Sequence, residues 1–146
     1  MTLHPLRGRA VAVAPLRIGL GLVWLFGARV SGAASTAALL AFATGALLVV
    51  ILAVNDPRSR LFEQREVFDP PPGAVVAGPV RQALRASVPS TVGVSVLAAL
   101  VVVPYPVLAA FLGGVSAGLG AAGLLAASRT DPALLLDPRT GRLYRG

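Results

Sequence analysis

The chain has 146 residues, of which 55% are hydrophobic, with a mean hydropathy of +0.78 and a formal net charge of +7. This apolar content exceeds what a soluble core of that size needs, which argues against an ordinary water-soluble domain. The lack of cysteine excludes disulfides, thiolate nucleophiles and zinc–thiolate or iron–sulfur sites.

Four apolar blocks predict an all-α membrane protein whose four transmembrane helices form two helical hairpins. The spans are expected at about residues 10–30, 33–54, 86–103 and 107–127, with a loop at 55–85 and a tail at 128–146. Each block is close to the roughly 20 residues that cross a hydrocarbon core about 30 Å thick. The whole chain is therefore expected to be a single integral membrane domain.

The first block carries an internal proline and two flanking arginines. Pro15 suits the first turn of a helix, so the span itself is expected to be Leu16–Val30. Arg17 and Arg29 would then extend from its two ends to lipid headgroups, while Trp24 packs between helices. A cleaved signal peptide is the alternative, because basic residues precede the apolar run and small residues follow it.

Within this block, Leu16–Leu25 reads LRIGLGLVWL and resembles the opening span of DoxX-type four-span membrane proteins. The resemblance implies a redox accessory role, with a bound quinone or a partner oxidoreductase. Arg29 stands where that family commonly has a lysine, and the long charged loop also departs from its pattern. The chain is therefore not assigned to that family.

The loop after the second block offers a new helix start. Asp56 is a suitable cap and Pro57 a suitable first residue for a short amphipathic segment that reaches Phe68. A solvated loop is the equal alternative. Further on, Pro79 is expected to open the helix that leads into the third span, and Pro89 to kink it.

The fourth block contains two rows of small residues at four-residue spacing, and these rows form a candidate helix-packing face. The rows consist of Gly113, Ala117 and Ala121, and of Gly114, Gly118 and Ala122. Packing within the bundle of this chain is favoured over a dimer interface. In the tail, Ala133–Leu136 and Arg142–Arg145 are expected to pair as a β-hairpin, with Gly141 at positive φ in the turn.

The distribution of arginine predicts the orientation of the protein in the cytoplasmic membrane. Of the 13 basic residues, all of them arginine, only Arg29 lies on the side opposite the termini. This positive-inside bias places the N-terminus, the loop and the C-terminal tail in the cytoplasm. The candidate lipid-headgroup contacts are Arg17, Arg29, Arg58, Arg60, Arg65, Arg81 and Arg85. Arginine in place of lysine, with much alanine, glycine, proline and valine, is associated with GC-rich bacterial genomes.

The titratable residues do not form a catalytic, cofactor or metal site. His4 is the only histidine, and it is expected in a solvent-exposed tail. The six carboxylates lie outside the predicted spans, at Asp56, Glu63, Glu66, Asp69, Asp131 and Asp137. No cofactor is therefore expected, and the protein is not expected to be an enzyme.

The leading hypothesis is a non-enzymatic accessory or scaffolding membrane protein with a basic cytoplasmic face. Its expected partners are the lipid bilayer and its anionic headgroups, together with a second copy or another membrane protein. Nucleic acid is not expected, because the arginines do not cluster with stacking aromatic residues. The alternatives are a small oligomeric transporter or holin-like pore, and a DoxX-like redox accessory protein.

Overall fold

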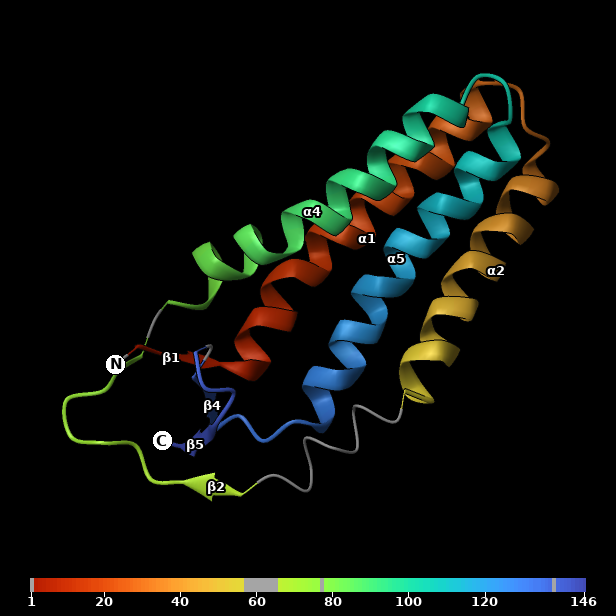
Figure 1. Cartoon of the computed structure of the whole chain (residues 1–146). Helices are drawn as coiled ribbons and strands as arrows, with labels where there is room; N and C mark the ends of the chain where they lie inside the picture. The colour runs from red at the N-terminus through yellow and green to blue at the C-terminus, as the bar shows by residue number, and fades with distance from the viewer. Residues whose placement is uncertain (1, 57–65, 77, 138) are drawn as a thin grey trace.

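The computed structural model describes residues 2–56, 66–76, 78–137 and 139–146, and for residues 9, 79–84 and 86 it describes the backbone alone. The described chain forms four helices, α1 (Leu6–Val30), α2 (Ser35–Val54), α4 (Pro79–Val101) and α5 (Pro106–Arg129). It also forms five short strands, β1 (Thr2–Pro5), β2 (Val67–Phe68), β3 (Val75–Val76), β4 (Leu134–Leu136) and β5 (Leu143–Arg145). The molecule is thus a helical bundle with a small sheet at one end (Figure 1).

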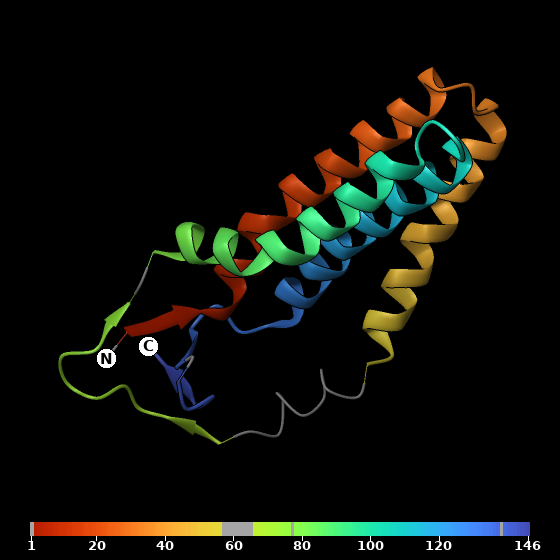
Figure 2. The same ribbon diagram turned by 45° about the horizontal axis from the view of Figure 1, so that its top comes forward.

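The helices form two antiparallel hairpins whose connecting turns lie at the same end of the bundle (Figures 1 and 2). We call this the turn end, and the opposite end, where both termini lie, the sheet end. At the turn end, Gly32 has a φ of 101°, a conformation that glycine adopts without steric cost. At the start of α4 and α5, Pro79 and Pro106 occupy the first turn, where no backbone N–H is required.

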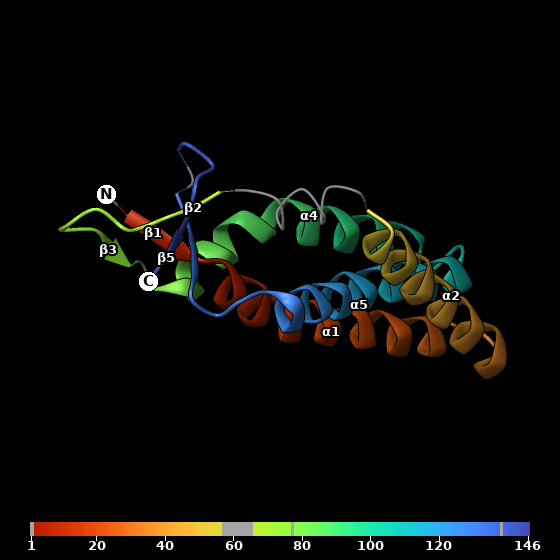
Figure 3. The same ribbon diagram turned by 90° about the horizontal axis from the view of Figure 1, so that it is seen from below.

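The central helix of the bundle is α5, which packs against α1 on one side and α2 on the other (Figures 1 and 3). Glycine allows their backbones to meet directly. A Cβ atom at Gly21 would lie 2.5 Å from the carbonyl oxygen of Gly113, and one at Gly113 would lie 2.7 Å from the carbonyl oxygen of Gly21. On the other side, a Cβ atom at Gly114 would overlap the carbonyl of Phe42.

The helices bury small side chains and expose large ones. The core at the turn end consists of Ala28, Ala33, Ala38, Ala109 and Ala110. By contrast, Phe26 is 70% exposed, Leu40 63% and Leu52 62%. Water would not favour such a surface, whereas lipid chains would.

Three helices, α1, α2 and α5, are long and apolar enough to cross a membrane, which indicates an integral membrane protein. The apolar part of α4 is shorter and covers Ser87–Val101. The four expected spans therefore correspond to three long apolar helices and one helix with a polar first third.

The first helix was expected to begin near Leu16, at the start of the first span, and this prediction is wrong. α1 begins at Leu6, directly after β1, and Pro15 lies inside it. The preceding turn stays helical because it packs on α5, where a Cβ atom at Gly120 would lie 2.9 Å from the carbonyl oxygen of Ala14. Tertiary packing thus offsets the hydrogen bond that Pro15 removes.

The sheet has the strand order β2-β5-β4-β1-β3. The antiparallel β4–β5 hairpin confirms the pairing predicted for the tail, and Gly141 has a φ of 69° in its turn. The other strands were not predicted: β1 pairs with β4 and β3, and β2 pairs with β5. His4 is accordingly half-buried in β1 opposite Leu136, so its expected place in an exposed tail is wrong.

The predicted amphipathic segment from Pro57 to Phe68 lies largely outside the described residues. Its last two residues form β2 instead of a helical turn. The sheet has its own small core, in which Leu3, Leu135 and Tyr144 are buried together.

The close contact between α5 and α2 predicts a strong effect of one methyl group at Gly114. We expect Gly114→Ala to lower the stability of the protein in detergent micelles by roughly 1–3 kcal/mol, because the Phe42 carbonyl leaves no room for it. Thermal unfolding measures the effect. Gly93→Ala is the matched control, since this helical glycine has open space around its Cβ position and should gain slightly in stability. Equal behaviour of the two variants would contradict the packing.

Candidate functional site

Exposed arginines gather at the sheet end of the molecule. They come from the starts of α1 and α4, the end of α5 and the β4–β5 hairpin, and they are Arg7, Arg85, Arg129, Arg139, Arg142 and Arg145. We call these six residues the basic end. Three chain segments that are far apart in sequence therefore contribute positive charge to one end of the bundle.

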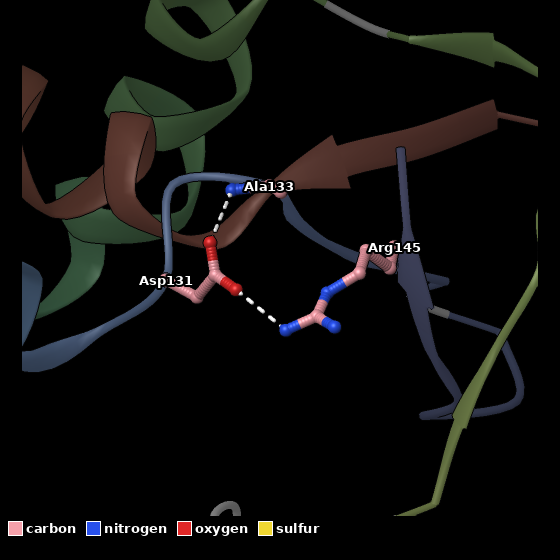
Figure 4. Close-up of polar contacts among 3 residues, drawn as sticks. All are labelled: Asp131, Ala133 and Arg145. Carbon is pink, nitrogen blue, oxygen red and sulfur yellow. Dashed lines mark hydrogen bonds and ion pairs between the residues drawn. The ribbon is translucent and has the colours of Figure 1, made fainter.

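One arginine of the basic end is held by a carboxylate in the connection from α5 to β4 (Figure 4). Asp131 accepts a hydrogen bond of 3.0 Å from the backbone N–H of Ala133 and one of 2.9 Å from Nη2 of Arg145. These two donors lower the pKa of Asp131 below its ordinary value. The contact is partly exposed, so it orients Arg145 more than it stabilises the fold.

A second carboxylate organises the hairpin turn. Asp137 is buried and accepts hydrogen bonds from Oγ1 of Thr140, at 2.7 Å, and from the backbone N–H of Arg139, at 3.0 Å. Both donors lower the pKa of Asp137, the hydroxyl of Thr140 most of all. The turn predicted around Gly141 is thus built on an ionised aspartate, which fixes the position of the arginines beside it.

Aromatic residues support the basic end from the sheet. The guanidinium of Arg142 lies 5.5 Å from the centre of the Phe68 ring, and the Phe68 and Tyr144 rings are 6.3 Å apart. This is a cation–π arrangement that holds the charge at the surface. Phe68 is 42% exposed, so an apolar side chain lies beside the arginine.

A separate polar cluster lies where α1, α4 and α5 meet. Nη2 of Arg17 donates to Oγ of Ser90 at 3.0 Å, and its Nε lies 3.5 Å from Oγ1 of Thr91. Oγ of Ser116 donates to the backbone carbonyl of Arg17 at 2.9 Å. We call these four residues the Arg17 cluster. Arg17 is half-buried in the middle of α1, instead of in the first turns of a helix.

The sequence alone indicates Arg17 but not its partners. Ser90 and Thr91 are more than 70 residues away, and periodicity does not reveal which face of α4 meets α1. Hydroxyl side chains within apolar helices were the available signal, because such groups usually bond across helix contacts.

The other predicted headgroup contacts have different outcomes. Arg85 is exposed near the start of α4, and Nη1 of Arg29 donates to the carbonyl oxygen of Ala33 at the turn end. The side chains of Arg58, Arg60, Arg65 and Arg81 lie outside the described part of the chain. Lipid contact by these arginines stays a prediction.

The predicted helix-packing face lies inside the bundle. Gly113 and Ala117 pack towards α1, and Gly114 and Gly118 pack towards α2. All four are buried, whereas Ala121 and Ala122 are half-buried. The four buried positions are therefore covered by helices of the same chain.

Trp24 lies in the contact between α1 and α5, because a Cβ atom at Gly113 would lie 3.0 Å from the Cβ atom of Trp24. Its buried indole N–H has no acceptor among the described residues. Within the described chain, no three His, Cys, Asp or Glu side chains lie close enough together to hold a metal ion.

Comparison of this chain with models of protein families, with curated proteins and with solved structures gives no match.

The lowered pKa of Asp131 and Asp137 predicts acid sensitivity of the sheet. A carboxyl whose pKa is lower in the folded state stabilises that state above its unfolded pKa of about 4, and this stabilisation disappears as the pH falls further. We expect amide signals of β4 and β5 in detergent micelles to be unchanged from pH 7 to 5 and to be lost at lower pH.

The variant Asp137→Asn should weaken the same signals at neutral pH, because a neutral amide accepts the two hydrogen bonds less strongly. Asp69→Asn is its control, since Asp69 is an exposed aspartate that also precedes a proline. Equal effects of the two variants would contradict the role assigned to Asp137.

Proposed function

We propose that this chain is a non-enzymatic accessory or scaffolding protein of the cytoplasmic membrane, which spans it four times and holds its basic end against anionic lipid headgroups. The observation that carries the proposal is the composition of the sheet. Its strands come from the N-terminus, from the loop between α2 and α4, and from the C-terminal tail. These are the segments whose arginines predict a cytoplasmic location.

The connectivity of the helices supports four crossings. Both helical hairpins have their turns at the turn end, and the sheet joins the chain segments at the other end (Figure 1). If α5 crosses the membrane from the turn end to the sheet end, the chain must first reach the turn end, where α5 begins. The preceding helix, α4, must therefore cross in the opposite direction. The shorter apolar part of α4 then requires local thinning of the bilayer or flanking side chains that extend to the headgroups.

Charge supports the orientation and the lipid partner. The six arginines of the basic end are exposed at the sheet end, Arg29 is exposed at the turn end, and Arg17 is half-buried between them. An anionic leaflet attracts each such residue with about 1 kcal/mol, so several of them together hold the sheet against the headgroups. The exposed ring of Phe68 beside Arg142 adds an apolar contact of the kind found at membrane interfaces.

The orientation is testable by cysteine labelling, because the natural chain contains no cysteine. We expect a thiol at Ser31→Cys, at the turn end, to react with a membrane-impermeant maleimide in intact cells. A thiol at Pro71→Cys, between β2 and β3, should react after the membrane is permeabilised. The reverse pattern, or labelling of both positions in intact cells, would contradict the proposed topology.

The lipid partner is testable with the full chain in nanodiscs of mixed phosphatidylglycerol and phosphatidylcholine. We expect anionic lipid to be enriched around the protein, and Arg129→Gln with Arg139→Gln to reduce this enrichment several-fold, since each charge contributes about 1 kcal/mol. Mass spectrometry of the bound lipid measures it. Ser128→Ala is the control, because Ser128 is an exposed uncharged neighbour of Arg129. Wild-type protein without a preference for anionic lipid would refute the proposed function.

A further inference from the structure

We infer that the Arg17 cluster is a binding site for the phosphate of one anionic lipid, which reaches the seam between α1 and α4 from the sheet end. This inference rests on the proposed membrane placement. It concerns a single defined site, whereas the basic end described above would attract headgroups collectively.

The geometry supplies a guanidinium with a fixed orientation. Thr91 is only 7% exposed and lies beside Nε of Arg17, whereas Ser90 is exposed and accepts from Nη2. Ser116, 4% exposed, anchors the backbone of Arg17 from α5. The guanidinium thus extends from a buried hydroxyl towards an exposed one, and a phosphate oxygen can replace the Ser90 hydroxyl as the acceptor of Nη2.

The depth of the cluster fits a headgroup and not an acyl chain. The apolar segment Ser87–Val101 is about 22 Å long at about 1.5 Å per residue, which is shorter than a hydrocarbon core of about 30 Å. The bilayer beside α4 must therefore become thinner, which lowers the headgroups there towards the middle of the membrane. Ser90 lies three residues inside this segment, so a lowered headgroup comes within reach of Arg17.

The surrounding groups favour a phosphate. Oγ of Ser90 now donates to the carbonyl oxygen of Ser87 at 3.2 Å, a long hydrogen bond that it can exchange for a phosphate oxygen. Arg85, exposed five residues before Ser90 on α4, adds positive charge at the boundary that the lipid crosses.

Native mass spectrometry of the full chain in mild detergent tests the site. We expect one tightly bound phosphatidylglycerol per chain and much weaker retention of phosphatidylcholine. Arg17→Gln should weaken retention of the anionic lipid about tenfold, which corresponds to about 1.4 kcal/mol, because a charge-assisted hydrogen bond to the phosphate is lost. Arg17→Lys keeps the charge but not the planar donors, so its retention of the anionic lipid should lie between that of the wild type and that of Arg17→Gln.

The Ser90 hydroxyl is tested separately, because Arg17→Gln removes hydrogen bonds between helices and could unfold the bundle. Ser90→Ala should weaken retention about threefold. Ser128→Ala is the matched control: both serines are exposed and donate to the carbonyl three residues earlier. Unchanged retention in Ser90→Ala and Arg17→Lys would overturn the site, whatever the stability of Arg17→Gln.

Two further experiments are needed. The first distinguishes a lipid phosphate from free phosphate, and the second distinguishes failure of this site from failure of the proposed function. Inorganic phosphate in excess should not displace the lipid; displacement, or stabilisation by phosphate without lipid, would overturn the assignment to a lipid. If Arg129→Gln with Arg139→Gln leaves the lipid preference in nanodiscs unchanged while Arg17→Gln loses its single lipid, the proposed function fails and the site stands. The reverse result removes the site alone.

Discussion

The close approach of α5 to α1 and α2 is the constraint on which the remaining structure depends. Where Gly21 meets Gly113, and Gly114 meets Phe42, backbone lies against backbone. Inside a bilayer, apolar side chains gain little by leaving lipid, so helix association relies on dispersion and hydrogen bonding at short range. Small residues are consequently buried and large ones face outwards, the opposite of the arrangement in a water-soluble bundle.

In the sheet, β1, β4 and β5 bury large apolar side chains, as strands do in water-soluble proteins. Leu3 and Leu143 are the largest fully buried side chains among the described residues, and both lie in strands. Because both helical hairpins return the chain to one end, the bundle brings β1, the strands of the loop and the tail hairpin close enough to pair. Strands of two residues would not be stable alone. The glycine contacts therefore determine indirectly where the arginines of the basic end lie.

Local sequence patterns predicted the features that depend on neighbouring residues. The apolar blocks indicated α1, α2 and α5, Pro79 marked the start of α4, and Gly141 marked the hairpin turn. Features that depend on distant partners were not predictable in this way. The strand β1 exists because Leu135 and Val76 lie beside it, and Pro15 is tolerated because α5 supports the preceding turn. For the candidate sites, the predicted headgroup contacts included Arg17 and, of the basic end, only Arg85. They did not include the hydroxyls and aromatic rings that orient the arginines.

The position of α4 is determined differently from that of the other helices. α5 meets α1 and α2 through glycine, whereas hydrogen bonds of Arg17 to Ser90 and Thr91 join α4 to α1. Polar contacts of this kind within a membrane contribute modestly, on average about 0.6 kcal/mol, so they hold a helix less firmly than close backbone packing. α4 begins only two residues after β3, which pairs with β1. A lipid phosphate bound at Arg17 would therefore act on the hydrogen bonds between α1 and α4, and through β3 on the sheet that carries the basic end.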